Sequence, residues 1–416
     1  MKKMRDSGCS YLGDIPEDWT VAPLKHYFHI TKRIAGEIGH DVLSITQKGL
    51  KVKDVTSGEG QLAADYSGYQ LVEPGDFAMN HMDLLTGWID CSSMHGVTSP
   101  DYRVFQIDRP DFDKRYFLYF FQTCYSARIF YGFGKGISGM GRWRLPADQF
   151  KNMLIPVPGI AAQNRIADYL DAKCMDIDNA IEAAEASIAE YEAYKKSVIF
   201  EAVTKGLDSS VPMKDSGIEW LGLVPAHWSL SRAKYLFEQR STRGNTTPVH
   251  LAATQSHGMY PQKNLEGVVK VAEGTDIQQF KTVHVNDYVI SLRSFQGGFE
   301  MSEYEGVCSP AYTVFYAIKP IFHGYFKWLF KSQGFINAMD AGTTGIREGK
   351  NINFKDFANS ELVVPPLAEQ KLIAENLVSI SADVNRLIAT KKSVIEELKA
   401  YRKSLIYEVV TGKREI

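Results

Sequence analysis

The chain repeats itself, and this internal duplication constrains the fold more than any other feature of its 416 residues. The repeated motifs keep the same order in both copies, with an offset of 209 near the start (221 − 12) and 207 near the end (370 − 163). Copies of about 200 residues are too long for solenoid repeats and predict two duplicated domains. The matching pairs include Leu12-Gly13-Asp14-Ile15-Pro16 with Leu221-Gly222-Leu223-Val224-Pro225, Ser99-Pro100 with Ser309-Pro310, and Ala162-Gln163 with Glu369-Gln370.

The end of each copy has the period of a long amphipathic helix. Apolar residues recur at steps of three and four, which is the spacing of a coiled-coil seam, with polar interruptions at Lys195, Lys391 and Arg402. Each helix should span about 40 residues, or about 60 Å. The predicted seam residues are Ile177, Ile181, Ile188 and Val198 in the first helix, and Val384, Ile388, Ile395, Leu398 and Leu405 in the second.

Each helix could pack on its own globular domain or on the helix of the other copy. A domain of this size has a radius of gyration of only about 15 Å, so a helix of about 60 Å would extend beyond it. Residues 159–206 carry five Lys/Arg and nine Asp/Glu, whereas residues 367–416 carry nine and seven. Opposite net charges favour pairing of the two helices, and the connectivity predicts that they run antiparallel.

The predicted fold class is therefore α+β, with two tandem mixed α/β domains joined by two long helices that form an antiparallel coiled coil with pseudo-twofold symmetry. Proline at 158 and 366 marks the expected helix starts, and glycine at 206 and 412 the expected ends. The expected segments are a first globular domain at 1–158, a central helix at 159–206, a second globular domain at 207–366 and a C-terminal helix at 367–416.

Composition and motifs argue against several functional classes. No stretch approaches the length of a membrane helix and the first residues lack the apolar run of a signal peptide, so we expect a cytoplasmic protein. The five cysteines lie far apart, and the histidines form no paired metal motif, so no metal site is predicted. No nucleophile, phosphate loop or metal cluster can be assembled, which disfavours an enzyme.

A glycine-containing stretch precedes each helix, and in the first copy it is locally basic, although the net charge of the whole chain is only −2. Between Arg128 and Lys151 there are five basic residues and one acidic residue, within a glycine-rich run. Such a segment suits phosphate and base-edge contacts, but it could equally be a basic surface hairpin with Trp143 tucked into a core. The candidate DNA-binding residues are Lys135, Ser138, Arg142, Trp143 and Arg144 in the first copy, and Thr343, Thr344, Arg347, Lys350 and Asn351 in the second.

Each domain begins with a proline and a tryptophan three residues apart, Pro16 with Trp19 and Pro225 with Trp228. We interpret these tryptophans as anchors that tie the start of each domain to its core, rather than as platforms for a ligand.

Taken in order, these motifs resemble the specificity (S) subunits of type I restriction-modification systems, and the resemblance covers essentially the whole chain. It rests on Leu-Gly-x-Ile/Val-Pro-x-x-Trp at each domain start, Pro-x-x-Ala-x-Gln before each helix, and Tyr-Lys/Arg-Lys-Ser near each helix end. The first copy departs mildly from the second at Gly159-Ile160-Ala161-Ala162.

The resemblance implies two target-recognition domains that each read half of an asymmetric bipartite site on double-stranded DNA. It also implies partners, namely two methyltransferase (M) subunits and restriction/translocase (R) subunits, with S-adenosylmethionine, ATP and Mg²⁺ bound by those partners and none by this chain. The alternative is a two-headed protein-binding adaptor that shares the architecture and lacks DNA specificity.

Overall fold

The chain folds into two compact units. The computed structural model describes residues 3–55, 65–107, 109, 111–136, 143–243, 249–266, 277–342 and 352–416. The first unit contains residues 1–184 together with 392–416, and the second contains residues 185–391. Both units therefore combine a globular part with a portion of each long helix. Within the described residues, no helix is both long enough and apolar enough to cross a bilayer.

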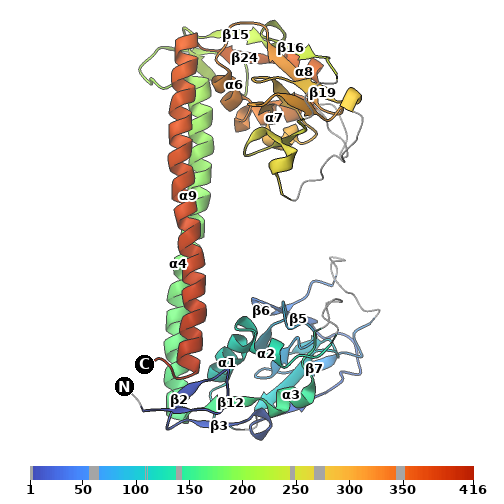
Figure 1. The fold of residues 1–416 in the computed structure, drawn as a ribbon, viewed down its shortest axis with the longest axis vertical. Helices are drawn as coiled ribbons and strands as arrows, with labels where there is room; N and C mark the ends of the chain where they lie inside the picture. The colour runs from blue at the N-terminus through green and yellow to red at the C-terminus, as the bar shows by residue number, and fades with distance from the viewer. Residues whose placement is uncertain are drawn as a thin grey trace. The chain divides into compact units, whose positions relative to one another are not determined.

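The globular part of the first unit is built around a four-stranded antiparallel sheet in the order β4-β11-β8-β9, with helix α1 (Lys114–Ser126) against it (Figure 1). Four two-stranded antiparallel sheets surround it, pairing β1 with β2, β3 with β12, β5 with β6 and β7 with β10. The strands are β1 Met4–Asp6, β2 Asp14–Pro16, β3 Thr20–Pro23, β4 Phe28–Thr31, β5 Leu43–Thr46, β6 Gly49–Val52, β7 Gln70–Val72, β8 Phe77–Met79, β9 Ile89–Cys91, β10 Gly96–Thr98, β11 Arg103–Ile107 and β12 Leu154–Val157; the short helices are α2 Ile129–Gly132 and α3 Ala147–Asn152.

The second unit repeats this plan. Its four-stranded sheet has the order β16-β23-β20-β21, and its two-stranded sheets pair β13 with β14, β15 with β24, β17 with β18 and β19 with β22. The strands are β13 Met213–Asp215, β14 Leu223–Pro225, β15 Ser229–Arg232, β16 Phe237–Arg240, β17 Leu251–Thr254, β18 Gly258–Pro261, β19 Lys281–Val283, β20 Tyr288–Ile290, β21 Glu300–Met301, β22 Gly306–Cys308, β23 Thr313–Ala317 and β24 Glu361–Val364; the short helices are α5 Ser294–Gly297, α6 His323–Leu329, α7 Gln333–Gly342 and α8 Phe354–Asn359.

Aromatic residues form the core of each globular part. Phe28, Phe77 and Phe105 from the sheet of the first unit pack with their ring centroids 5.2 to 5.8 Å apart. Phe237, Tyr288 and Phe315 make the corresponding cluster in the second unit, with centroids 5.4 to 5.6 Å apart. Because large buried aromatic side chains contribute most of the apolar area removed from water, the same side-chain cluster organises both folds.

The long helices α4 (Ile160–Lys205) and α9 (Leu367–Val410) follow directly after the last strand of each globular part. Each begins beside a proline, and the motif glutamine fixes the junction. In the first unit Gln163 Nε2 donates to Pro158 O (2.8 Å) and Gln163 Oε1 accepts from the backbone N–H of Asp113 (2.9 Å). Gln370 makes the same pair of bonds in the second unit, with Pro365 O and Phe322 N. These glutamines therefore hold each helix start against the globular part that precedes it.

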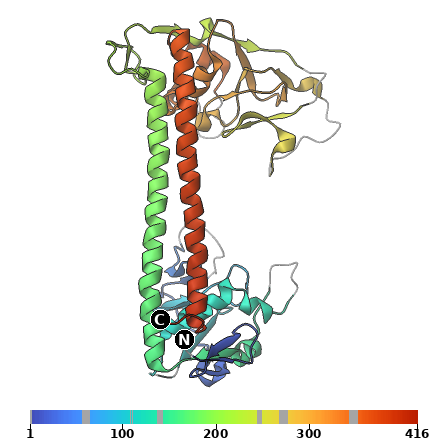
Figure 2. The same cartoon turned by 60° about the vertical axis from the view of Figure 1, so that its left-hand side comes forward.

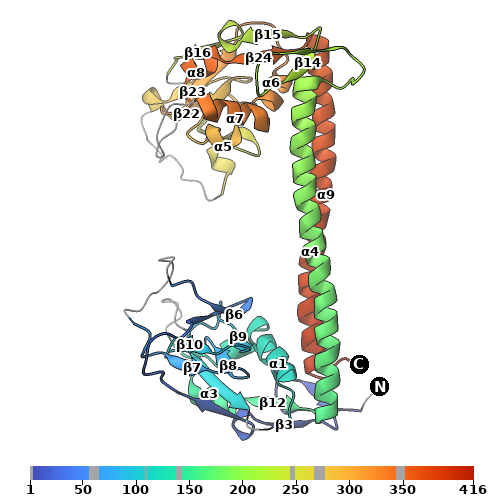
Figure 3. The same cartoon turned by 180° about the vertical axis from the view of Figure 1, so that it is seen from behind.

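The two helices lie side by side and run antiparallel in each unit (Figures 1, 2 and 3). In the first unit Asp178 of α4 forms an ion pair with Arg402 of α9, at 3.2 Å. In the second unit Lys195 Nζ of α4 donates to Asn385 Oδ1 of α9, at 2.9 Å. From the first contact to the second, the residue number rises along α4 and falls along α9, so the helices run antiparallel, as expected. The strands and helices of both units confirm the expected α+β class.

All nine predicted seam residues are at least partly buried. Four of them are buried, namely Ile177, Val384, Ile395 and Leu405. The other five are half-buried, namely Ile181, Ile188, Val198, Ile388 and Leu398. The polar interruptions Lys195 and Arg402 are the residues that make the two cross-helix contacts, so the seam changes from apolar to polar at equivalent places (195 + 207 = 402).

Each helix also ends against the globular part of the other copy. Tyr116 of the first domain donates its hydroxyl to Val410 O at the end of α9 (3.0 Å), and Tyr325 of the second donates to Val203 O near the end of α4 (2.7 Å). The helices end at glycines with left-handed backbone, Gly206 (φ 81°) and Gly412 (φ 72°), a conformation that glycine adopts without strain.

The two motif tryptophans stand at these helix ends and are almost fully buried, Trp19 at 4% exposure and Trp228 at 1%. A β-carbon at Gly412 would lie 3.1 Å from the Trp19 ring, and one at Gly206 would lie 3.1 Å from the Trp228 ring. This close packing confirms the interpretation of both tryptophans as structural anchors.

Candidate nucleic-acid interface

The basic loop of the first unit starts and ends in a short antiparallel bridge between Lys135 and Arg144. Lys135 N donates to Arg144 O (2.8 Å), and Arg144 N donates to Lys135 O (3.1 Å). The candidate residues Ser138 and Arg142 fall within 137–142, outside the described residues. The structure thus defines the base of the loop, where two cationic side chains lie on neighbouring strands.

Trp143 packs into the domain rather than standing out from the loop. Its indole Nε1 donates to Tyr131 O (2.8 Å), and its ring lies 5.4 Å from the Tyr131 ring. The side chain is half-buried at the edge of the aromatic core. A base contact by Trp143 stays a prediction.

One backbone bond ties the end of the loop to the turn that follows β8, and one side-chain bond ties it to β11. Leu145 N donates to His81 O (3.0 Å), and Arg103 Nη2 donates to Leu145 O (2.8 Å). The Arg103 guanidinium also lies over the Phe150 ring, 4.8 Å from its centroid. Because Arg103 is buried and held on both sides, it positions the loop rather than contacting a ligand.

His81 is neutral in this environment. Burial is the main cause that lowers its pKa to about 4, and the cations Arg103 and Arg144 add to the effect. The positive charge of this surface at neutral pH therefore comes from arginine and lysine alone.

Arg144 lines a groove of about 580 Å³ on the same domain. Six stretches of the chain contribute to it, and most of the lining side chains are polar. The lining residues are Val42, Leu43, Ser44, Lys53, Tyr69, Asn80, Met82, Asp83, Ser99, Asp101, Tyr102 and Arg144.

Several of these groove residues are suited to contacts with nucleic acid. Lys53 and Arg144 can pair with phosphate, and Arg144 can also bind a guanine edge through two hydrogen bonds. Asn80 has the amide that matches adenine. Burial raises the pKa of Tyr69 and of Tyr102, so both hydroxyls stay protonated and can donate.

Two turns in the groove are held by their own side chains. Asn80 Oδ1 accepts from Met82 N (3.2 Å), and Asp83 Oδ1 accepts from Leu85 N (2.9 Å) and Thr86 N (3.1 Å). A groove built on such fixed turns is preorganised for binding, which lowers the entropy cost of association.

The five candidate residues of the second unit fall within 343–351, outside the described residues. They are Thr343, Thr344, Arg347, Lys350 and Asn351. The chain on either side belongs to α7, which ends at Gly342, and to the buried Ile352.

Of the residues that line this groove, sequence reasoning named only Arg144 as a candidate, and its contact with DNA stays a prediction. Lys53, Tyr69, Asn80 and Tyr102 stand in no recognisable motif, and up to 91 positions (144 − 53) separate them from Arg144. The only signal that could have pointed to them is polar residues clustered in the turns between short strands.

Comparisons with known families and proteins agree on one group. The model of the type I restriction modification DNA specificity domain matches residues 229–397. A protein of Methanocaldococcus jannaschii described as the MjaX type I restriction enzyme specificity subunit is 23% identical, over 97% of this chain and 95% of its own length. The EcoKI specificity subunit of Escherichia coli is 34% identical over 23% of this chain and 20% of its own length.

Solved structures show the same fold. A chain from a structure of a type I R-M system, described in terms of complex assembly and conformational transition, aligns with a TM-score of 0.69 and 13% identity. The alignment covers 96% of this chain and 99% of that one. The HsdS subunit from Thermoanaerobacter tengcongensis aligns with a TM-score of 0.52 and 13% identity, over 96% of this chain and 98% of that one.

Proposed function

We propose that this chain is a specificity subunit of a type I restriction-modification system and that it reads a bipartite DNA site, one part through each globular domain. Subunits of this family provide sequence specificity and no catalysis, so the chain is a non-catalytic DNA specificity subunit.

One observation carries the proposal of two readers. The two globular parts share their strand order and their aromatic cluster, whereas polar residues that line the groove of the first unit have different counterparts in the second. Asn80 after β8 corresponds to Ser291 after β20, and Asp101 corresponds to Ala311. Direct readout of bases depends on the identity and placement of such polar side chains. Two domains with equivalent aromatic cores and different polar side chains on their surfaces would therefore read two different half-sites. The whole DNA site would then be asymmetric.

The proposed partners follow from the family. We expect double-stranded DNA, two methyltransferase subunits and restriction/translocase subunits in the cytoplasm, with S-adenosylmethionine, ATP and Mg²⁺ bound by those partners. The helix pair would then set the length of the DNA between the half-sites, since its length is fixed by about 1.5 Å per residue.

A domain exchange tests the proposal of two readers. Residues 20–150 would be replaced by the same region of another family member, and the modified chain would be expressed with its methyltransferase partner. A map of methylated sites in the cellular DNA should then show one half-site changed, with the other half-site and the gap unchanged. A change in both half-sites would contradict independent reading, and DNA without any methylated site in the unmodified control would contradict the function itself.

A further inference from the structure

The motif tryptophan of the second unit has a carboxylate partner. Trp228 Nε1 donates to Glu369 Oε2 at 2.8 Å, and the other oxygen of Glu369 lies 2.8 Å from His227 Nε2. Glu369 stands in the first turn of α9, where a negative charge is also favoured by the helix dipole. One carboxylate thus satisfies a buried indole N–H at the junction of helix and domain.

The first unit keeps the tryptophan and lacks the carboxylate. Trp19 occupies the equivalent position (228 − 209) and packs edge-on against Tyr116, with centroids 6.3 Å apart. Ala162 stands where Glu369 stands in the second unit (369 − 207). Trp19 Nε1 is buried and has no hydrogen-bond partner among the residues that the structure describes. Native structures rarely leave such a donor unsatisfied, so this one needs a partner.

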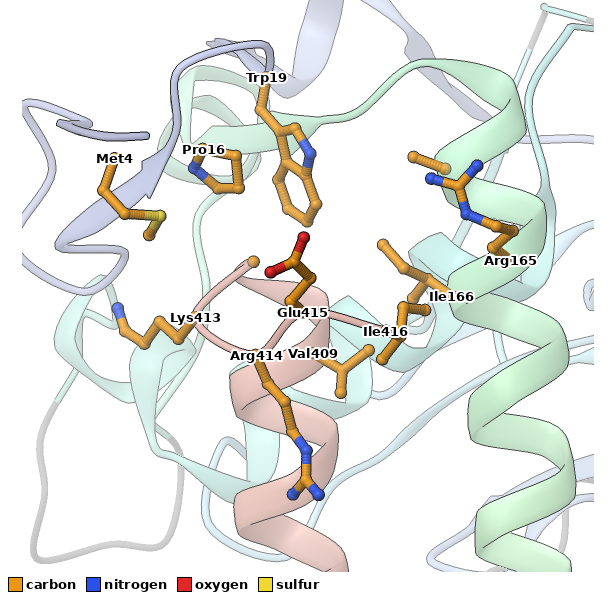
Figure 4. A pocket seen from close by; sticks show the side chains of 12 residues that line it. Met4, Pro16, Trp19, Arg165, Ile166, Val409, Lys413, Arg414, Glu415 and Ile416 are labelled. Atoms are coloured by element: carbon orange, nitrogen blue, oxygen red, sulfur yellow. The ribbon is translucent and has the colours of Figure 1, made fainter. Parts of the chain in front are cut away.

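A cavity of about 180 Å³ lies beside this indole. Ala162 and Arg165 of α4 line it on one side, and the segment after α9, from Gly412 to Ile416, lines it on the other. In Figure 4 the nitrogen of Trp19 is on the edge of the ring that faces the side of Arg165. A water molecule takes about 30 Å³, so the cavity has room for a carboxylate group.

Among the charged side chains of the lining, three are cations, Arg165, Lys413 and Arg414, and one is a carboxylate, Glu415, so the lining has a net positive charge (Figure 4). Arg165 is exposed and makes no hydrogen bond or ion pair with the residues described by the structure. The first turn of α4 contains no acidic residue, so its positive dipole end is not compensated. The other two cations of the lining are engaged, Lys413 with Leu12 O and Arg414 with Glu408 at 3.7 Å.

We propose that this cavity binds a carboxylate supplied from outside the chain, with Trp19 Nε1 as the neutral donor and Arg165 as the cation. The ligand would occupy the place that the Glu369 carboxylate occupies in the second unit. Its source is a small carboxylic acid or an acidic side chain of a partner subunit, which present the same chemistry. This site is independent of DNA recognition and does not rest on the proposed function.

The test follows the indole N–H signals of the full-length chain by NMR after labelling its tryptophans with ¹⁵N. Trp19→Phe identifies the Trp19 signal, and the Trp228 signal serves as an internal control because its N–H is already bonded. Titration with sodium acetate, at ionic strength held constant with chloride, should shift the Trp19 signal saturably and leave Trp228 in place. No shift of Trp19, or an equal shift with chloride alone, would overturn the proposal.

Two variants connect the response to the named residues. Arg165→Leu, which introduces the residue found at the equivalent position 372, should weaken acetate binding about tenfold or more, as expected for loss of a charged hydrogen-bond partner. Ala162→Glu supplies the missing carboxylate, so the Trp19 signal should move toward that of Trp228 and stop responding to acetate. Unchanged acetate affinity in Arg165→Leu would contradict the role of that residue.

Further measurements separate the possible sources of the carboxylate. If Glu415→Gln moves the Trp19 signal in the absence of acetate and acetate has no effect on the wild type, the carboxylate is internal and the proposal is wrong. A shift on addition of the methyltransferase subunit without acetate identifies an acidic side chain of that partner. A shift with acetate and none with the partner identifies a small acid.

Discussion

The two units share their interior and differ at their polar contacts. Tyr116 and Tyr325 donate to the ends of opposite helices, and Gln163 and Gln370 hold the helix starts through the same pair of bonds. By contrast, the cross-helix contact is an ion pair in the first unit and a hydrogen bond from a charged lysine to a neutral amide in the second. The tryptophan carboxylate is present only in the second unit.

The comparison of the two units indicates which positions the fold depends on. Contacts that remove apolar area from water or satisfy buried backbone groups recur in both copies, because losing one costs about 1 to 5 kcal/mol. The partly exposed cross-helix contacts contribute about 1 kcal/mol or less each and have diverged. The duplicated architecture therefore tolerates different surfaces, and surfaces are where recognition takes place.

The largest expected effect tests the shared interior. Phe105→Ala and Phe315→Ala remove equivalent, fully buried rings, so each should lower the free energy of unfolding of its own unit by about 3 to 5 kcal/mol. Hydrogen exchange of peptides from each unit measures the two effects separately. Leu85→Ala, at a side chain that is 58% exposed, should change the stability by less than about 0.5 kcal/mol. Strongly unequal effects of the two phenylalanines would show that the cores are not equivalent.

The second prediction concerns the groove of the first unit that Arg144 lines. Arg144→Ala should weaken binding of the assembled complex to its DNA target by about 1 to 3 kcal/mol if Arg144 contacts a base through two bonds. Relaxed specificity should be confined to the half-site read by the first unit. Lys151→Ala removes an exposed cation of the same domain outside the groove and serves as the control. Equal losses in both variants would indicate nonspecific attraction of phosphate rather than base contact.

Glu369→Ala would convert the tryptophan site of the second unit into that of the first. The loss of the acceptor for Trp228 Nε1 should destabilise this unit by about 1 to 3 kcal/mol, because a buried donor is left without a partner. Glu369→Gln keeps an oxygen acceptor and should cost less. Thermal unfolding monitored by tryptophan fluorescence compares the two variants, and an equal loss in both would mean that the charge rather than the acceptor matters.

The smallest expected effect distinguishes the two cross-helix contacts. Asp178→Asn should lower stability by about 0.2 to 1 kcal/mol, and Asn385→Asp should raise it by a similar amount by giving Lys195 an ionic partner. Both changes should become smaller at 1 M salt, where screening is strong. Melting temperatures across a salt series measure them, with Glu185→Gln as the control, at an exposed carboxylate of α4 that makes no ion pair among the residues that the structure describes. Effects that do not depend on salt would contradict an ionic origin.

Sequence alone predicted the features that leave a periodic or repeated signal. The duplication gave the two domains, the steps of three and four gave α4 and α9, and the buried Trp19 and Trp228 behaved as anchors. Strands of two to five residues are too short to show a readable alternation, so the sheets could not be predicted in detail. The contact of Asp178 with Arg402 spans 224 positions (402 − 178), and no local pattern reports such a pair.

The division of the chain also affects the order in which its parts can fold during synthesis. The second unit is one continuous stretch, 185–391, whereas the core of the first unit includes Leu405, Ile406, Val409 and Val410 from the end of the chain. The domain that leaves the ribosome first is thus the last to complete its core. Until the end of α9 has been translated, the apolar surface that it covers stays exposed to solvent. The nascent chain can aggregate or bind chaperones through this surface.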